Sequence, residues 1–213
     1  MHPSRMHALV RPVALRRVFL GIGFVVGMRG ALLAQPTPAG ESPPVSTAGV
    51  RFMTGMILHH AQALEMTALI TGRSADDRLA RLGERIAVSQ RDEIALMAEW
   101  LRDRRQALPD PASPHTHHEH GPMPGMASPA DMAALADLRG AAFDRRFLTL
   151  MIRHHEGALV MVKGVLGETG GAGDGELFRF ASDVDADQRA EIRRMQALLD
   201  SLSTIKATVR RRP

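Results

Sequence analysis

The chain has no cysteine and no tyrosine among its 213 residues, and it has only one tryptophan. Without cysteine it can form no disulfide and no thiolate metal site, and it has no thiol nucleophile. So few aromatic side chains also argue against a base-stacking platform for nucleic acid, although the net charge of +4 suggests a basic binding surface. Two residue types are abundant instead, with 13 methionines and 10 histidines.

The N-terminal segment combines basic residues with a short apolar run. Residues 1–34 hold five arginines and no acid, and the apolar run 18–26 is followed by small residues up to Ala34. This order is typical of a secretory signal peptide, and the run is too short to span a bilayer, which takes about 20 residues. We therefore predict a signal peptide over 1–34 and export to the periplasm or beyond by the Sec route. Arg16-Arg17 also partly resembles a twin-arginine signal, and a retained membrane anchor is the alternative.

The positive charge of the chain lies in this segment. Cleavage after Ala34 removes five arginines and leaves a nearly neutral protein. We accordingly expect no nucleic-acid partner and no stable association with a membrane after cleavage. The charge thus indicates a compartment and not a polyanionic ligand.

The remaining sequence predicts an all-α four-helix bundle built from a duplicated helical hairpin. Apolar residues recur at helical spacing with no convincing strand alternation. The predicted helices cover 50–71, 76–108, 129–166 with an interruption at Gly140, and 176–202. The predicted parts are a flexible lead-in 35–46, a bundle domain 47–204 with hairpins 47–108 and 129–204, a linker 109–128, and a frayed basic tail 205–213. Ser128-Pro129, with Asp131 in the first turn, predicts a helix start.

The two hairpins share a chemical pattern. Residues 52–70 match residues 147–165 at a constant offset, and the second helices match as well. The shared positions pair Phe52 with Phe147, Met56 with Met151, His59-His60 with His154-His155, Met66 with Met161, Gln90 with Gln188, Glu93 with Glu191, and Met97 with Met195. On a helix, the methionines and histidines of one copy span about 120° of one face, although adjacent histidines diverge by about 100°.

This pattern predicts metal ligands on the helix faces. Imidazole suits copper, zinc and nickel, whereas thioether sulfur selects Cu(I), and Ag(I) follows for the same reason. The predicted ligands are Met56, His59, His60, Met66, Met151, His154, His155 and Met161. Packing is the alternative for such residues, and we expect it for Met97 and Met195. The shared glutamines and glutamates either support the ligands and neighbouring helices or form a solvated face.

The linker predicts a second, looser set of ligands. It holds His115, His117, His118, His120, Met123 and Met126 within a short tract. Such tracts bind metals, although a solvated loop is the alternative. A di-iron carboxylate bundle would need Glu-x-x-His motifs, and the sequence contains none.

The segment from Met123 to Met161, with its Met-Pro-Gly-Met and Met-x-x-His-His elements, closely resembles the bacterial "domain of unknown function 305" family. The upstream copy and the Gln-x-x-Glu-Ile-x-x-Met pattern extend the resemblance over about residues 48–202. It implies a ferritin-like four-helix fold, export, and copper or silver handling in at least some members.

These observations favour a periplasmic, non-enzymatic protein that binds Cu(I) or Cu(II), and also Ag(I), for buffering, relay or resistance. Metal ions are the expected partners, together with a copper exporter or a periplasmic metallochaperone. One alternative is an exported helical interaction module in which histidine and methionine only pack. The other is a metal-dependent redox enzyme.

Overall fold

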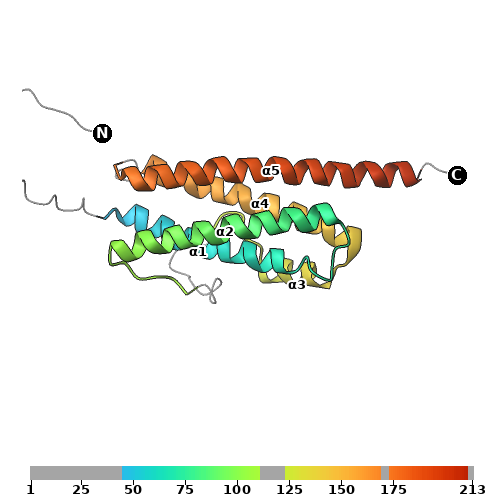
Figure 1. The fold of residues 1–213 in the computed structure, drawn as a ribbon, viewed down its shortest axis with the longest axis horizontal. Helices are drawn as coiled ribbons and strands as arrows, with labels where there is room; N and C mark the ends of the chain where they lie inside the picture. The colour runs from blue at the N-terminus through green and yellow to red at the C-terminus, as the bar shows by residue number, and fades with distance from the viewer. Residues whose placement is uncertain (1–44, 111–122, 169–172, 211–213) are drawn as a thin grey trace, which may run out of the picture. The chain divides into compact units, whose positions relative to one another are not determined.

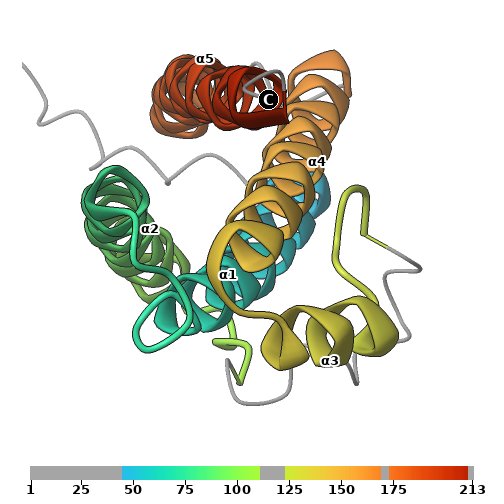
Figure 2. The same ribbon diagram turned by 90° about the vertical axis from the view of Figure 1, so that its right-hand side faces the viewer.

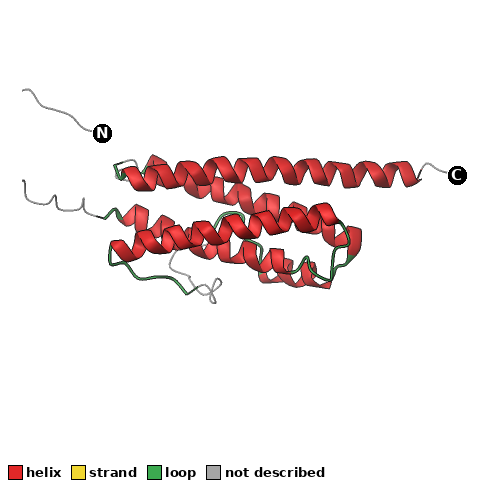
Figure 3. Cartoon of the chain, in the orientation of Figure 1, coloured by secondary structure: helices red, strands yellow, loops and turns green. Residues whose placement is uncertain are grey.

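The computed structural model describes residues 45–110, 123–168 and 173–210, and these are helical with short connections (Figures 1 and 3). The helices are α1 (Thr47–Ala68), α2 (Asp77–Asp103), α3 (Pro129–Asp137), α4 (Gly140–Gly167) and α5 (Gly175–Arg210). No strand occurs in the described ranges, so the all-α prediction is confirmed. The predicted signal peptide, nearly all of the lead-in, and His115, His117, His118 and His120 lie outside those ranges.

Polar side chains begin the helices where the sequence suggests. Ser46 and Asp76 accept backbone N–H groups at the starts of α1 and α2. At α3, the Ser128 hydroxyl accepts from the Asp131 N–H, and the Asp131 carboxylate accepts from the Ser128 N–H, which completes a capping box behind Pro129. The predicted helix start at Ser128-Pro129 is therefore confirmed.

Three predicted boundaries need correction. The second helix ends at Asp103 and not at residue 108, because Arg105 takes a left-handed φ of 54° and ends the turn. The first helix ends at Ala68 and not at residue 71. The third predicted helix divides into α3 and α4 across extended backbone at Leu138 and Arg139, so the expected interruption at Gly140 is confirmed. The fourth continues to Arg210, so the expected frayed tail is helical over most of its length.

The long helices form two hairpins that pack side by side. α1 contacts α2 and α4 contacts α5, while α1 with α4 and α2 with α5 join the hairpins. The short α3 lies against α4, on the side away from α5 (Figure 2). No helix among the described residues is long and apolar enough to cross a membrane.

The apolar core consists of two clusters. One gathers around Phe143 and Phe147, and the other around Met53 and Trp100. Met97 and Met195 are fully buried, as expected for packing. Every long helix contributes to both clusters, and the stretch between its two contributions carries the shared histidines or the shared Gln and Glu. A layer of polar side chains therefore crosses the core between the clusters.

Gly157 on α4 lets the segment before α3 pack closely against the helix. A Cβ atom at this position would lie 2.0 Å from the carbonyl oxygen of Pro124, whereas a Cβ at Gly164 on the same helix would meet nothing within 4 Å. Because the obstacle at Gly157 is backbone, no rotamer change can relieve it.

We therefore expect Gly157→Ala to lower the free energy of unfolding by about 1–3 kcal/mol through overpacking. Gly164→Ala is the matched control, and it should leave stability unchanged or raise it by up to about 1 kcal/mol, since glycine disfavours helix interiors. Urea denaturation followed by circular dichroism measures both. Equal effects of the two substitutions would contradict this account of the close approach.

Candidate metal centre

The polar layer consists of eight side chains, two from each long helix. They are His59, His60, Gln90, Glu93, His154, His155, Gln188 and Glu191, and each is at most 8% exposed. The shared glutamines and glutamates are thus buried and do not form a solvated face. Burying so many polar groups is costly unless each finds a partner.

His59 and His154 meet at the centre of the layer, where α1 contacts α4. Their ring centroids lie 3.8 Å apart and the ring planes are inclined by 37°. His59 Nε2 donates a hydrogen bond to the Pro124 carbonyl oxygen at 3.0 Å. A carbonyl can only accept, so Nε2 carries the proton and Nδ1 keeps its lone pair. The His154 ring hydrogen-bonds to the backbone of His59.

The outer two histidines each face a glutamate of the neighbouring helix in their own hairpin. His60 Nε2 contacts the Glu93 carboxylate, and His155 Nε2 lies 2.6 Å from Glu191 Oε2. Within each hairpin the two rings are about equally spaced, with centroids 6.4 Å apart for His59 and His60 and 6.1 Å apart for the other pair. The layer therefore runs as Glu-His-His-His-His-Glu across the four helices.

Each imidazole of the layer has one nitrogen engaged and one without a partner. The unpartnered atoms are His59 Nδ1, His60 Nδ1, His154 Nε2 and His155 Nδ1, and the layer adds Gln90 Oε1 and Gln188 Nε2. An imidazole that binds a metal usually donates its other N–H to a carboxylate or a carbonyl oxygen. The partners of His59, His60 and His155 have that chemistry.

Burial keeps the central imidazoles neutral. Burial first, and the nearby His60 second, lower the pKa of His59 to about 3, against the raising effect of the Pro124 carbonyl. Burial likewise holds the pKa of His154 well below its usual value, with His59 as the next cause. A neutral imidazole offers a lone pair to a metal ion without first losing a proton.

The buried methionines lie on both sides of the layer. Met56 belongs to the cluster around Trp100, whereas Met66 and Met151 belong to the cluster around Phe147. All three are fully buried. Met56 thus packs on one side of the layer, and Met66 and Met151 pack on the other.

Met123 and Met161 meet at a surface cavity of about 210 Å³. Measured from a Cβ built on Gly55, Met161 Cε lies at 3.4 Å and Met123 Sδ at 3.8 Å. Met123 precedes Pro124, whose carbonyl holds His59, so the cavity lies beside the central pair of histidines. A predicted helix ligand and a predicted linker ligand thus share one cavity.

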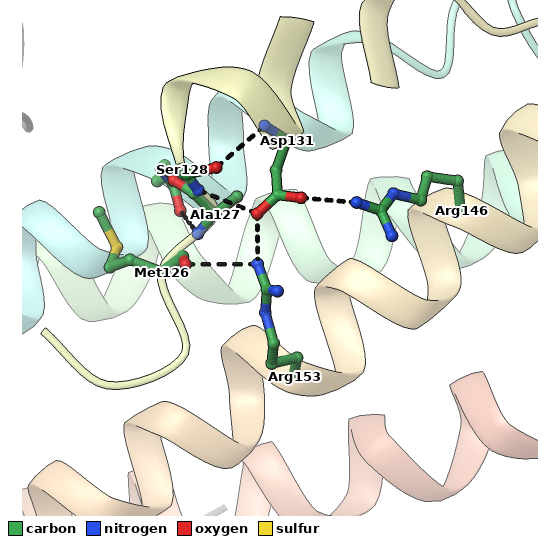
Figure 4. A network of polar contacts seen from close by, with 7 residues as sticks. Met126, Ala127, Ser128, Asp131, Arg146 and Arg153 are labelled. Atoms are coloured by element: carbon green, nitrogen blue, oxygen red, sulfur yellow. Dashed lines mark hydrogen bonds and ion pairs between the residues drawn. The ribbon is translucent and has the colours of Figure 1, made fainter. Parts of the chain in front are cut away.

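The segment 123–128 is fastened to α1 and α4, in contrast to the flexible linker expected over 109–128. The Gln62 side chain exchanges two hydrogen bonds with the backbone of Ala127, at 2.7 and 2.8 Å. Arg153 donates to the Met126 carbonyl oxygen and, at 2.9 Å, to Asp131, which also accepts from Arg146 (Figure 4). The bond from Arg153 is the main cause that lowers the pKa of Asp131 to about 2. These contacts hold Met123 and Met126 in place.

Sequence reasoning missed Gln62, Pro124, Arg153 and Gly157 as the residues that place this segment. The only available signal was an amide at position 62 on an otherwise apolar helix face. Among the described residues, no group of three or more His, Asp and Glu side chains is arranged so that it could hold a metal ion. The ligand roles therefore stay predictions.

A family model for DUF305, a domain of unknown function, matches residues 49–199. The chain belongs to the DUF305 family. A DUF305 fragment from Deinococcus radiodurans is 37% identical with a TM-score of 0.65, and the match covers 75% of this chain and 99% of that one. A candidate secreted DUF305 protein from Streptomyces coelicolor is 33% identical with a TM-score of 0.63, and the match covers 73% and 94%.

The chain is also similar in structure to CopM, whose structures include Cu(I)-, Cu(II)- and Ag-bound forms. The Cu(II) form is 27% identical to this chain with a TM-score of 0.58, and the match covers 72% of this chain and 96% of CopM. The Cu(I) form is 25% identical with a TM-score of 0.56. An uncharacterized mimivirus protein, L153, is 36% identical over 55 residues, so this chain matches only 36% of that protein's length.

The buried imidazoles predict a stability that falls on acidification. Their folded pKa values lie below the ordinary value of 6.5, so the unfolded chain binds more protons as the pH falls below 6.5. The free energy of unfolding should therefore decline between about pH 6.5 and 4, by up to about 1.4 kcal/mol per pH unit for each ring. Denaturation at pH 7, 6 and 5 in the absence of metal measures it.

The double variant His59→Leu/His154→Leu is the control for this decline. It removes the contribution of the two central imidazoles and leaves His60, His155 and every carboxylate in place. Its stability should depend on pH much less than that of the wild type. A wild-type protein equally stable at pH 7 and pH 5 would contradict the neutral, buried state of the two rings.

Proposed function

We propose that this DUF305 protein is an exported copper-binding protein that holds Cu(I) or Cu(II), and also Ag(I), for buffering or relay outside the cytoplasm. One observation carries the proposal: all four imidazoles of the polar layer keep a buried nitrogen without a partner. Unsatisfied buried nitrogens destabilise a fold unless something else binds them. The metal-bound forms of CopM, at 25–27% identity, support copper or silver as that ligand.

The thioether cavity gives the proposal its selectivity. Met123 and Met161 offer two thioether sulfurs, which suit Cu(I) and Ag(I) better than harder ions. The carboxylate that lines the same cavity, Glu168, is paired with Arg51. Their cavity opens at the surface beside Pro124, which hydrogen-bonds His59. We therefore infer that metal meets the methionines first and the histidines next. Metal is cargo in this proposal, and no catalytic step is assigned to the protein.

The interaction-module alternative also has an observation behind it. The contacts of His60 with Glu93 and of His155 with Glu191 join neighbouring helices, which a purely structural role would explain. A structural role, however, leaves the second nitrogen of each ring unexplained. The proposal of export depends on the composition of residues 1–34. A periplasmic metallochaperone or a copper exporter is expected as a partner only if the protein passes its metal on.

Competition titrations with Cu(I) and Ag(I) chelators, and direct titration with Cu(II), test the proposal. We expect Met123→Leu/Met161→Leu to weaken Cu(I) and Ag(I) binding by at least about tenfold, equivalent to ~1.4 kcal/mol. His59→Leu/His154→Leu should weaken Cu(I) and Cu(II) binding by at least as much, because imidazole suits both oxidation states.

The matched control is Met97→Leu/Met195→Leu, which also removes two buried and equivalent thioethers but leaves the cavity intact. It should bind metal as the wild type does. Equal affinities for all three double variants would overturn both binding sites. Loss of binding only when His115, His117, His118 and His120 are replaced by alanine would assign the metal to the linker alone.

A further inference from the structure

A groove between α2 and α5 is left uncovered among the described residues. Two adjoining cavities of about 410 and 310 Å³ lie along it and share Leu96, Phe180 and Asp183 in their linings. α2 and α5 stand apart on the side of the bundle opposite α3 (Figure 2). On α2 the lining runs from Ser89 to Asp103, a length of about 20 Å at 1.5 Å per residue.

The groove has an apolar floor. Leu96 is 54% exposed, unusually high for leucine in a helix that packs in a bundle, and Phe180 is half-buried beside it. Val184 and Trp100 lie beneath them and are buried. The apolar lining residues lie one helical turn apart on each helix, Leu96 with Trp100 on α2 and Phe180 with Val184 on α5. Such a floor accepts apolar side chains that an amphipathic helix presents at i and i+3 or i+4.

The rim of the groove is acidic. Seven of its lining residues are acidic against one base, Arg179. Asp92, Asp183 and Asp187 form no ion pair with any residue in the described ranges. The pKa of Asp187 is raised, first by burial and then by the negative charges of Glu93, Glu191 and Asp183. Glu176 is paired with Arg104, and Arg194 acts on Asp187 from outside the lining. The acids still outnumber the bases, so the field in the groove is negative.

We propose that this groove docks a cationic amphipathic helix of a partner protein. The negative electrostatic field of the groove favours a positively charged ligand. A second copy of the chain would set one acidic rim against another, and an anionic lipid or nucleic acid would be repelled. A lone cation would leave the apolar floor exposed, whereas leucines on a basic helix would cover it. The proposal stands apart from copper binding, although Glu93 lies in the groove wall and contacts His60.

Tryptophan fluorescence can report binding in the groove. Trp100 is the only tryptophan of the chain, and it lines the groove. A 14-residue peptide of leucine and lysine, with leucines at i, i+3, i+4 and i+7, serves as the probe. The control peptide has the same composition, with leucines scattered around the helix. We expect the full-length protein to bind the first peptide at least tenfold more tightly than the second, with a change in tryptophan fluorescence.

Three variants locate the binding. Asp183→Asn/Asp187→Asn should weaken it at least fivefold and reduce its dependence on salt, since screening acts on exposed charges. Leu96→Ala should weaken it at least threefold. Glu65→Gln/Asp137→Asn removes two exposed acids elsewhere and should leave the affinity unchanged. Circular dichroism confirms that each variant is folded.

Four outcomes would overturn the proposal. The first three are no binding of either peptide, equal binding of both peptides, and equal weakening by the control variant. The fourth is a dimer in sedimentation that dissociates on Asp183→Asn/Asp187→Asn, which would assign the groove to a second copy of the chain. Binding that emerges only after the five N-terminal arginines are replaced by glutamine would assign it to the chain's own N-terminal segment. None of these outcomes depends on metal binding, so the peptide experiments and the metal titrations test the two proposals independently.

Discussion

A buried row of four imidazoles between two glutamates is the constraint on which the rest of the structure depends. It crosses all four long helices and divides the apolar core into two clusters. Polar groups at this depth must meet specific partners, so the row fixes the register of each helix against its neighbours. The apolar clusters supply most of the stabilisation from burial, but hydrophobic contacts alone would allow one helix to shift along another. The row therefore contributes specificity to a fold that the clusters stabilise.

The two hairpins repeat the same row, but the two faces along which they meet are covered differently. On the α1–α4 side, the segment 123–128 closes over the histidines, held by Gln62, Arg153 and the space at Gly157. On the α2–α5 side the described residues leave an acidic groove that reaches Glu93. The same layer is thus approached through thioethers on one side and through carboxylates on the other. Met123 and Met161 line the first approach, where Glu168 is paired with Arg51, and seven acids line the second.

Sequence patterns predicted what depends on periodicity. The four long helices, the cap at Ser128 and the matching histidine pairs follow from local spacing and composition. Local spacing shows that Met56 and Met66 share one face of α1. It could not reveal that this face crosses the polar layer, so that the two methionines pack in opposite clusters. Nor could it place Met123 beside Met161, since that contact depends on a fit between Pro124 and Gly157 that exists only in three dimensions.

The Pro124 carbonyl links the surface cavity to the core. It fixes the proton of His59 on Nε2 and leaves Nδ1 as the basic atom. Because the neighbouring Met123 lines the cavity, any ion that draws Met123 toward Met161 acts on the same turn that orients the imidazole. Moving that turn would lengthen a buried hydrogen bond, which Gln62 and Arg153 oppose. A rigid segment therefore favours a binding site formed before the metal arrives, and it limits the entropy lost on binding.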